Sequence, residues 1–287
     1  MKINDNILKE VYPSRKKEAK KYDHGSVLLI SGSQIYTGSP GIAGLAALRS
    51  GADVTKVAAP RRAANVVAGL GPDMITQPLA GEALNMTHLP KLLEITKGME
   101  SVSPKLAVVI GPGVGRREET KKLIRRYVKQ ASVPMVIDAD GIYAFENQGK
   151  EFLGENCLIT PHLYEFSVLT GENISNFSTK ERTEKVKSFA AEMGAVIALK
   201  GSTDIVSDGS DVGLNELSVP ELAAGGCGDS LAGIAGAALS RTGDPFKAGM
   251  VAVYLNTKAG KLAADEKGES LIAQDLIDKL PEALKEI

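Results

Sequence analysis

Short apolar runs that alternate with helical stretches constrain the fold of this chain more than any other feature of its sequence. Residues 26–31 form an apolar run that ends in a loop, and the alanine-rich stretch 42–50 follows with helical spacing. The same order recurs at residues 53–58 and 61–68, 106–110 and 116–130, and 135–138 and 141–146. Each connection between parallel strands has to return over the sheet. We therefore expect an α/β fold of three layers (α/β/α), with a mostly parallel central sheet and helices on both faces.

The pattern in the second half of the chain predicts antiparallel strands at one edge of the sheet and then a helical region. Further strands are expected at residues 156–160, 195–199, 204–207 and 214–219. Asp208-Gly209-Ser210 offers turn chemistry before the last of these, which predicts a partly antiparallel edge. Helices rich in small residues are expected at 229–241, 245–264 and 274–287. No linker rich in Ser, Pro or Gly divides these elements, so we expect one domain over residues 1–287, with residues 1–23 as a helical extension.

Charge and cysteine content argue against several classes of partner. The 287 residues include 34 basic and 35 acidic side chains, so no bulk field favours nucleic acid or an anionic membrane, although a local patch stays open. The basic run 15–21 is interrupted by Glu18 and has no interleaved aromatic residues, and we interpret it as a solvated helix face. Cys157 and Cys227 form neither a disulfide framework nor a CxxC metal pattern, and no apolar stretch approaches the length of a membrane span. We expect a cytoplasmic protein with no nucleic-acid or membrane partner.

The strongest chemical signal is the segment Ala224-Gly225-Gly226-Cys227-Gly228-Asp229, which opens a long helix of small residues. Glycines leave backbone amides free to face an anion, and a helix N-terminus adds partial positive charge, so phosphate is the natural ligand. Asp229 stands in the first turn, where a carboxylate beside phosphates can take the proton of an attacking hydroxyl. The alternative is that Asp229 only caps the helix and the glycines only form a turn.

A second glycine group, Gly111-Pro112-Gly113-Val114-Gly115, follows an apolar run that is typical of a buried strand. Loops at the carboxyl ends of parallel strands face the ligand crevice of an open sheet. The group is not a Walker A loop, because no Gly-Lys-Ser/Thr follows, and Pro112 interrupts the spacing of a dinucleotide fingerprint. Taken alone, it is more typical of a structural turn.

Other strand-end loops carry polar residues that would meet in the same crevice. Asp138 and Asp140 could hold Mg²⁺ through water or could cap a helix. His162 could hydrogen-bond a ligand or lie solvated in a turn. Lys200 could meet a nucleotide phosphate or stay in solvent. No side chain is assigned as a direct metal ligand.

Cys227 is placed at a helix N-terminus, a position that makes a thiol more acidic. No histidine is near it in the sequence, and its small size explains a cysteine in that turn. We therefore do not assign it as a nucleophile.

Taken together, these blocks resemble the ADP- or ATP-dependent NAD(P)H-hydrate dehydratase family, a branch of the ribokinase-like superfamily. The resemblance extends from about residue 24 to about residue 264. It is carried by His24-Gly25-Ser26, Gly32-Ser33, Tyr36-Thr37-Gly38-Ser39-Pro40, Ala46 to Ala52, Gly111 to Gly115, Asp138 to Gly141, Thr160-Pro161-His162 with Glu165-Phe166, Lys200-Gly201 and Gly225 to Asp229. Several blocks in this order match by chance far less often than a single motif does.

Members of this family restore NADH or NADPH from the (6S)-hydrate: a nucleotide phosphorylates the hydrate hydroxyl, and loss of phosphate regenerates the dihydronicotinamide. The resemblance implies that Asp229 is the catalytic base. It implies hydrate contacts from Ser39, Gly113, His162 and Asp229, nucleotide contacts from Lys200, Gly201, Ser202, Thr203, Asp204 and Gly228, and an anion hole of the Gly225, Gly226, Cys227 and Gly228 amides. Mg²⁺ is expected with ADP or ATP, held largely by phosphates and water. A homotetramer and a separate NAD(P)H-hydrate epimerase are expected as partners.

Three positions depart from the family pattern. Cys227 stands where serine or threonine is usual, which removes a hydroxyl donor close to the bound phosphate. Leu163-Tyr164 follow His162 in place of Pro-Gly, which changes the loop path beside the histidine. Gly141-Ile142 replace Ala-Leu after the Asp-Ala-Asp block.

Two other functions fit the same residues. A small-molecule kinase of this fold, acting on a thiazole, a hydroxymethylpyrimidine or a sugar, would use the same Asp229 and the same amides. A non-catalytic nucleotide sensor would keep the fold but has no need of Asp229. The sequence leaves open the choice between ADP and ATP and between NADH and NADPH hydrates.

Overall fold

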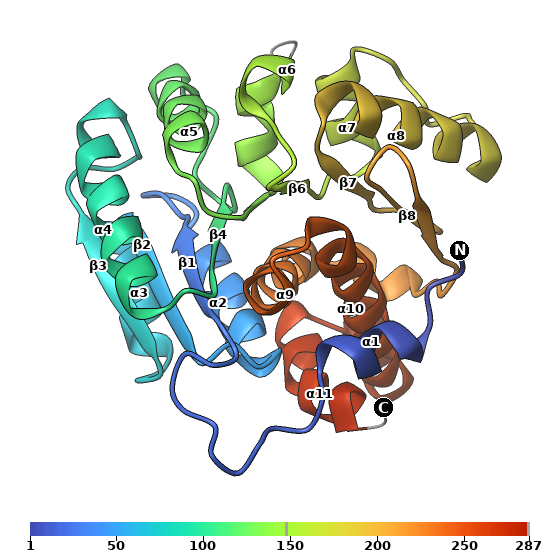
Figure 1. Cartoon of the computed structure of the whole chain (residues 1–287), viewed down its shortest axis with the longest axis horizontal. Helices are drawn as coiled ribbons and strands as arrows, with labels where there is room; N and C mark the ends of the chain where they lie inside the picture. The colour runs from blue at the N-terminus through green and yellow to red at the C-terminus, as the bar shows by residue number, and fades with distance from the viewer. Residues whose placement is uncertain (147–148, 286–287) are drawn as a thin grey trace.

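A mixed sheet of nine strands runs through the described chain, which comprises residues 1–146 and 149–285 of the computed structural model. The strand order is β3-β2-β1-β4-β5-β6-β7-β8-β9 (Figure 1). The strands are β1 (Ser26–Ile30), β2 (Val54–Pro60), β3 (Met74–Leu79), β4 (Leu106–Ile110), β5 (Met135–Ile137), β6 (Cys157–Ile159), β7 (Val196–Leu199), β8 (Asp204–Ser207) and β9 (Val212–Asn215). Strands β1 to β7 pair in parallel, and β8 and β9 are added antiparallel. The predicted parallel sheet with an antiparallel edge is confirmed.

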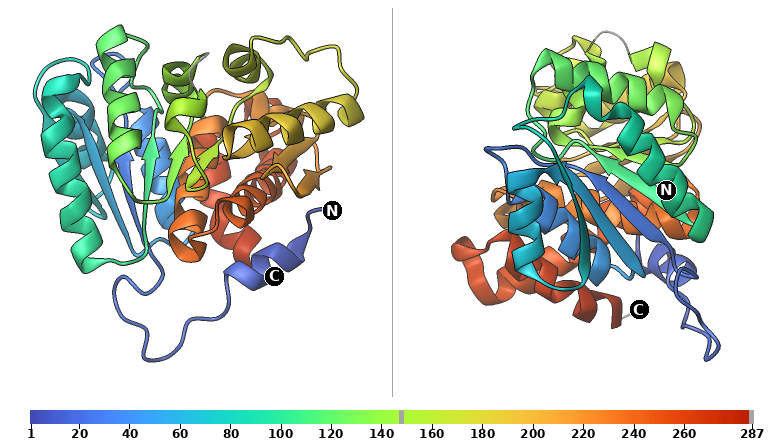
Figure 2. Two further views of the ribbon diagram at one scale, coloured as in Figure 1. Left: turned by 45° about the horizontal axis from the view of Figure 1, so that its top comes forward. Right: turned by 90° about the vertical axis from the view of Figure 1, so that its left-hand side faces the viewer.

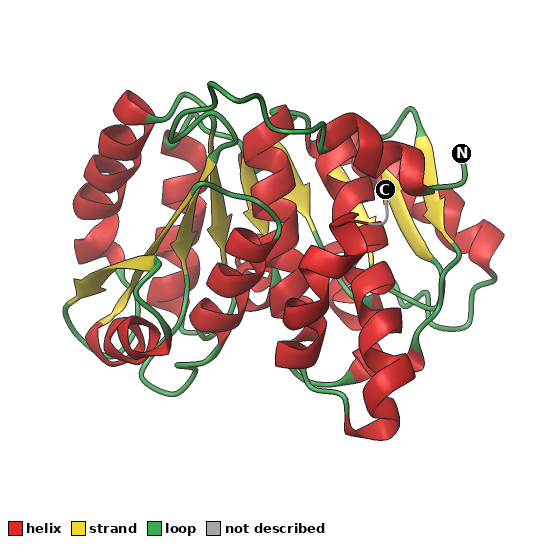
Figure 3. Ribbon diagram, turned by 90° about the horizontal axis from the view of Figure 1, so that it is seen from below, coloured by secondary structure: helices red, strands yellow, loops and turns green. Residues whose placement is uncertain are grey.

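Helices cover both faces of the sheet, as the view from below shows (Figure 3). Val27 and Leu29 of β1 face one apolar core, whereas Leu28 and Ile30 face the other, because successive side chains of a strand point to opposite faces. The first core is covered by α1 (Asp5–Val11), α2 (Ser39–Arg49), α3 (Arg61–Leu70), α9 (Cys227–Thr242), α10 (Pro245–Lys267) and α11 (Ala273–Lys285). The second is covered by α4 (Leu89–Val102), α5 (Glu118–Gln130), α7 (Leu163–Thr170) and α8 (Thr179–Met193), next to the short α6 (Gly149–Phe152). Within residues 1–146 and 149–285, no helix combines the length with the apolar character that crossing a membrane demands.

Several elements differ from the sequence prediction. The pattern does not predict β3, because Thr76, Gln77 and Pro78 interrupt the apolar run of this edge strand. It also gives no expectation for α4, α7 and α8. Residues 139–145 form a 3₁₀ helix, η2 (Ala139–Phe145), where an α-helix is predicted, and the last strand, β9, ends before residue 216. The predicted C-terminal helix is present as α11, but residues 286–287 lie outside the described residues.

The expected helical extension over residues 1–23 is wrong for most of its length. Helix α1 ends at Val11, because Pro13 disfavours helical backbone in the residue before it. The basic run 15–21 is irregular chain rather than a helix face, and it extends away from the sheet and its helices (Figure 2). Residues 1–3 run beside β9: the Ile3 amide donates to the Leu214 carbonyl at 2.9 Å, and the Leu214 amide donates to the Met1 carbonyl at 2.9 Å.

Small residues let α9 approach α2 and the sheet closely. A Cβ atom at Gly233 would lie 2.1 Å from the carbonyl oxygen of Ala43, and one at Gly236 would lie 2.4 Å from a methyl group of Val109. These glycines are therefore required by packing inside the chain, and this packing fixes the start of α9 against α2.

Replacing Gly233 with alanine is expected to destabilise the protein by about 1–3 kcal/mol, because the new methyl group meets a backbone oxygen that cannot rotate away. Gly98→Ala is the matched control, since Gly98 lies on the exposed face of helix α4 with open space around its Cβ position. The control is expected to stabilise by about 0.5–1 kcal/mol. Urea unfolding followed by circular dichroism measures both, and equal stabilities of the two variants would contradict the close contact between α2 and α9.

Candidate active site

The loops that leave the carboxyl ends of the parallel strands meet along one edge of the sheet. The register aligns Ile30 with Ile110, Ile110 with Ile137, and Ile137 with Ile159. The loops after β1, β4, β5 and β6 therefore start at the same level, and α9 begins beside them. Such an edge is where ligands bind in open α/β sheets.

The predicted glycine segment forms a tight turn into α9. Gly226 has a φ of 94°, a conformation that glycine adopts without strain, and it caps the helix without offering a side chain. The Cys227 amide donates to the Ala224 carbonyl at 3.3 Å. In the part of the chain that the structure describes, no protein group accepts from the amides of Gly225, Gly226, Gly228 and Asp229. Three of the four amides expected in an anion hole thus have no protein acceptor, the Cys227 amide donates to Ala224, and the Asp229 amide adds a further donor.

Asp229 lies in the first turn of α9, beside Ser39 of α2. Burial raises the pKa of the Asp229 carboxyl to about 6, and the negative charge of Asp138 adds to this rise, while Ser39 and Lys200 oppose it. At neutral pH the carboxylate is therefore mostly charged, yet it is more basic than an ordinary aspartate. This property suits a group that accepts a proton from a substrate.

Lys200, which follows β7, is held by buried carboxylates. Its Nζ lies 2.9 Å from Oδ1 of Asp138 and 3.9 Å from Oε2 of Glu165. Asp138 is 1% exposed and also accepts the Thr160 hydroxyl at 2.7 Å. Burial lowers the pKa of Lys200, but the two carboxylates more than offset it, so the pKa is raised. Lys200 is therefore a fixed cation rather than a solvated lysine, and its Nζ lies 3.6 Å from where a Cβ of Gly228 would be.

Asp138 and Asp140 are engaged by protein cations rather than by helix amides. Oδ2 of Asp140 accepts the Gly115 amide at 3.0 Å, and Oδ1 accepts Nε of Arg116 at 2.7 Å. Asp138 precedes η2 without capping it through its side chain. Among the described residues, no three His, Cys, Asp or Glu side chains gather as a metal site. Both carboxylates are thus ion-pair partners, an arrangement that the sequence interpretation did not include.

The side chain of His162 caps the N-terminus of α7. Its Nδ1 accepts the amides of Tyr164 and Glu165 at 3.1 and 3.2 Å, and the Glu165 carboxylate accepts the His162 amide at 2.8 Å. Burial and the charge of Lys200 lower the pKa of His162. The ring is therefore neutral, with its hydrogen on Nε2, which lies 3.5 Å from Oε1 of Glu165 and can donate to a ligand. His162 and Glu165 have the spacing of a capping box. This spacing is the feature of the sequence that points to Glu165 as a partner of His162.

A cavity of about 480 Å³ opens beside Lys200, a size that suits a nucleotide. Its walls come from the β7–β8 turn, η3 (Pro220–Ala223), and helices α9 and α10. The predicted residues that line it are His162, Lys200, Gly201, Ser202, Asp204, Cys227 and Gly228. Leu217, Val219, Pro220, Leu222, Asn256 and Thr257 also line it, and no sequence motif pointed to them.

Asp204 shapes the turn at the mouth of this cavity. One carboxylate oxygen accepts the Gly201 amide at 3.0 Å, and the other accepts Nδ2 of Asn215 at 2.9 Å. Burial raises the pKa of Asp204 to about 6. With both oxygens engaged, Asp204 holds the segment 200–204 in place, and Ser202 is left exposed there.

Gly113 and Ser39 form the opposite side of the crevice. Gly113 has a φ of 65°, and a Cβ there would lie 2.8 Å from Cβ of Tyr36 and 3.1 Å from Oγ of Ser39. Ser39 in turn adjoins Asp229. The fold therefore brings Ser39, Gly113 and Asp229 together on one side of Lys200, while His162 and the turn 200–204 lie at the cavity.

Cys227 has the properties of a packing residue. Burial raises the pKa of its thiol to about 11, and the charge of Asp229 adds to the rise. A thiol that stays protonated is a poor nucleophile, in agreement with the sequence interpretation.

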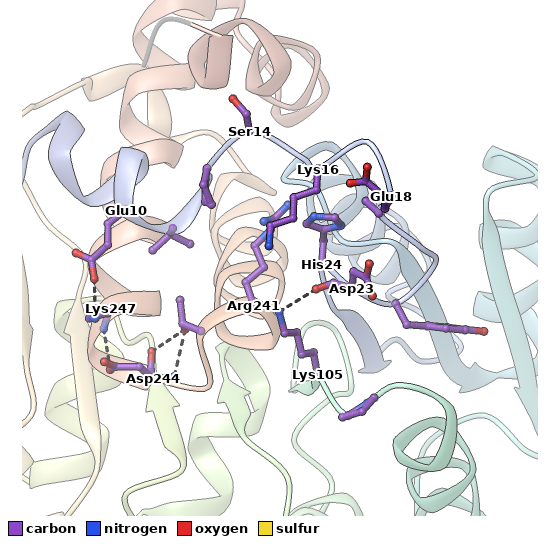
Figure 4. A pocket seen from close by; sticks show the side chains of 16 residues that line it. Glu10, Ser14, Lys16, Glu18, Asp23, His24, Lys105, Arg241, Asp244 and Lys247 are labelled. Carbon is purple, nitrogen blue, oxygen red and sulfur yellow. Dashed lines mark hydrogen bonds and ion pairs between the residues drawn. The ribbon is translucent and has the colours of Figure 1, made fainter.

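A larger cavity, of about 760 Å³, lies away from these residues, beside the irregular segment 12–24 (Figure 4). Some of its charged side chains are engaged by the protein: Lys247 pairs with Glu10 at 2.6 Å, and Lys105 donates to the Asp23 backbone carbonyl at 2.9 Å. Lys105 precedes β4, so this cavity opens at the amino ends of the strands. Size alone does not identify a site, and the converging groups favour the crevice at Asp229.

Known proteins resemble the chain over nearly its whole length. A sequence model of the NAD(P)H-hydrate dehydratase family matches residues 27–282. A bifunctional NAD(P)H-hydrate repair enzyme of Pyrobaculum aerophilum is 39% identical over 274 residues, 95% of this chain and 53% of that protein. An ADP-dependent (S)-NAD(P)H-hydrate dehydratase of Cenarchaeum symbiosum is 35% identical over 284 residues, 99% of this chain and 96% of that protein. The chain spans about half the length of the first curated relatives it matches, 53% and 50%.

Solved structures share the fold. The ADP/ATP-dependent NAD(P)H-hydrate dehydratase of Bacillus subtilis, co-crystallised with ATP/Mg²⁺, superposes with a TM-score of 0.78 at 26% identity, covering 99% of this chain and 97% of that one. A ribokinase-like superfamily protein of Enterococcus faecalis gives a TM-score of 0.83 at 23% identity, covering 99% and 95%. The predicted ribokinase-like form of the three-layer fold is confirmed.

Changing the charges around Asp229 is expected to move its pKa in opposite directions. Asp138→Asn removes a negative neighbour and should lower the Asp229 pKa below about 6, whereas Lys200→Met removes a positive neighbour and should raise it. Asp278→Asn, on the exposed face of α11, is the control and should leave it unchanged. Carbon-13 NMR titration of carboxyl groups measures all three, and shifts of the first two variants in the same direction would contradict the arrangement.

Proposed function

The chain belongs to the NAD(P)H-hydrate dehydratase family, and from this premise we propose that it uses ADP or ATP to dehydrate (6S)-NAD(P)H hydrate to NAD(P)H. The observation that carries the proposal is Asp229: its carboxyl has a raised pKa and lies beside unoccupied amides and the fixed cation of Lys200. A protein that only sensed nucleotide would not need such a carboxylate.

The adenine nucleotide is proposed to occupy the 480 Å³ cavity. Leu217, Pro220 and Leu222 provide apolar contact for the base. The turn 200–204 lies along the nucleotide, with Ser202 and Thr203 as further contacts, and Asp204 acts through the turn that it holds. Lys200 and the amides of Gly228 and Asp229 face the terminal phosphate, where charge-assisted hydrogen bonds are strongest.

The hydrate is proposed to lie on the other side of Asp229, against Ser39 and Gly113, with His162 as an additional donor from the cavity wall. Ser39 orients the hydrate hydroxyl toward Asp229. The hydroxyl oxygen attacks the terminal phosphorus, Asp229 takes the hydroxyl proton, and AMP or ADP leaves with the electrons of the broken P–O bond. The free amides of the turn into α9 stabilise the charge that develops on the phosphoryl oxygens.

The phosphorylated hydrate then loses phosphate. The lone pair of the ring nitrogen expels phosphate from the adjacent carbon, and loss of a proton from the next carbon forms the double bond of the dihydronicotinamide. Phosphate is a far better leaving group than hydroxide, so one phosphoryl transfer makes the dehydration feasible. The sum is hydrate and ADP or ATP converted to NAD(P)H, phosphate and AMP or ADP.

Mg²⁺ fits this site as a partner of the nucleotide rather than of a protein cage. The described residues contain no group of three ligands for a metal, and Asp138 and Asp140 already accept from Lys200 and Arg116. Bound with the nucleotide, Mg²⁺ would neutralise phosphate charge during the transfer.

The remaining assignments are proposals about the whole protein. We propose that residues 1–287 act as one catalytic domain, because one sheet connects its two ends. A cytoplasmic location is supported by two unpaired cysteines, Cys157 and Cys227. A homotetramer and a separate epimerase are proposed from the family alone. The small residues of α9 add no support for a tetramer, because they are already buried inside the chain. Light scattering of the purified protein tests the oligomeric state.

Asp229→Asn is expected to lower the rate of hydrate repair by about 10²–10⁴-fold, the usual contribution of a general base, while nucleotide affinity changes little. The assay supplies the (6S)-hydrate with ADP or ATP and follows the absorbance of the reduced nicotinamide, and Asp278→Asn is the matched control. No recovery by the unaltered protein, together with phosphorylation of a thiazole, a hydroxymethylpyrimidine or a sugar, would assign the chain to the kinases of this fold.

The pH profile gives a second test. Because a protonated Asp229 cannot accept the hydroxyl proton, kcat/KM is expected to fall as pH decreases through about 6 and to be level above it. The acidic limb should move to lower pH in Asp138→Asn. A profile that stays level down to pH near the ordinary aspartate value, about 4, would exclude Asp229 as the base.

A further inference from the structure

A third cavity, of about 590 Å³, lies on the same edge of the sheet as Asp229 but toward β3. It is lined by Gln34, Arg61, Arg62, Asn65, Val66 and Gly81. Gln34 lies in the loop after β1, Arg61 and Arg62 start α3 directly after β2, and Gly81 follows β3. All these positions come after the carboxyl ends of parallel strands, so the cavity lies along the same edge of the sheet as the proposed active site.

The cavity presents positive charge that the protein does not neutralise. Nη1 of Arg62 donates to the Gln34 carbonyl at 2.8 Å, which holds its guanidinium across the cavity. Arg61 makes no hydrogen bond or ion pair with any described residue, and none of the described lining residues carries a carboxylate. The nearby acid, Glu82, faces Arg117 at 3.6 Å. Two guanidinium groups with planar donor sets match a phosphate group, and the first turn of α3 adds charge of the same sign.

The position of the cavity fits one part of the proposed substrate. The strand order runs β3-β2-β1-β4, so Arg61 after β2 is two strands from Gly113 after β4. Neighbouring strands lie roughly 4.8 Å apart, which puts about 10 Å of sheet edge between the two residues. That span is within the reach of a dinucleotide whose nicotinamide lies at Asp229. With the adenine nucleotide in the proposed cavity on the β7–β9 side, the side of β2 and β3 is left for the adenosine half of the hydrate.

Exposed apolar side chains mark the path between the two places. Tyr36 is 53% exposed and lies against Gly113, and Ile35 beside it is 77% exposed. Both belong to the loop whose Gln34 carbonyl is held by Arg62. An exposed aromatic ring between a catalytic group and a basic cavity provides a surface on which a purine or a nicotinamide ring can stack.

We propose that this cavity binds the adenosine of the hydrate, with Arg61 and Arg62 receiving the 2′-phosphate that distinguishes NADPH hydrate from NADH hydrate. The assignment rests on the proposed function. It makes the two arginines specificity-determining residues, because only the phosphorylated substrate gives them an anion.

The test compares the two hydrates in variants of Arg61. Arg61→Gln is expected to raise KM for NADPH hydrate by about 10-fold, because it removes one charge-assisted contact. It should leave KM for NADH hydrate and for ATP unchanged. Arg61→Glu should raise the NADPH-hydrate KM further. Arg62→Gln should act in the same direction, with an added effect on both hydrates because it frees the loop at Gln34. Arg126→Gln, an exposed arginine of α5, is the control.

A binding measurement separates the inference from the proposed function. With ADP in excess to fill the nucleotide cavity, calorimetric titration is expected to give tighter binding of NADP⁺ than of NAD⁺ to the unaltered protein, and no preference in Arg61→Glu. Repair of both hydrates with the same preference in all variants would overturn the arginine subsite and keep the function. Absence of repair, combined with an Arg61-dependent preference for NADP⁺, would overturn the function and keep the subsite.

Discussion

The ion pair between Lys200 and Asp138 is the interaction on which the rest of the crevice depends. It joins the ends of β7 and β5 across β6, and Thr160 at the end of β6 donates to the same carboxylate. A cation and an anion with so little access to water are stable only when each compensates the lost hydration of the other. The ends of three neighbouring strands are thereby connected through one buried charge pair.

This pair also determines the chemistry of Asp229. Lys200 is shared among Asp138, Glu165 and Asp229, so its single positive charge cannot fully compensate any one of them. Asp229 lies beside Ser39 in the first turn of α9, and burial is the main cause of its raised pKa. Burial and the charge of Asp138 raise the Asp229 pKa, whereas the hydrogen bond with Ser39 and the charge of Lys200 lower it, and the result is a pKa of about 6.

The sequence predicted most of the sheet and supplied the residues proposed for the site, and physical reasons account for what it did not predict. Strand ends converge whenever a parallel sheet forms, so Ser39, Gly113, His162, Lys200 and Asp229 could be placed together from their loops. Strand β3 could not be predicted, because Pro78 disrupts the apolar pattern of a strand there. The engagement of the Cys227 amide depends on the exact path of a turn, and the pairing of Lys200 with Asp138 joins residues 62 positions apart. The apolar wall of the cavity has no motif, since any similar side chains would serve.

The pairing of residues 1–3 with β9 has a consequence for how copies of this protein can meet. An exposed edge strand offers unpaired backbone groups on which a neighbouring molecule could build. On the β9 border, Ile3 and Leu214 already satisfy those groups within the chain. On the β3 border, Pro78 lacks the amide hydrogen that a further ladder would need. Joining of sheets from one subunit to the next is thus hindered at Leu214 on one border and at Pro78 on the other.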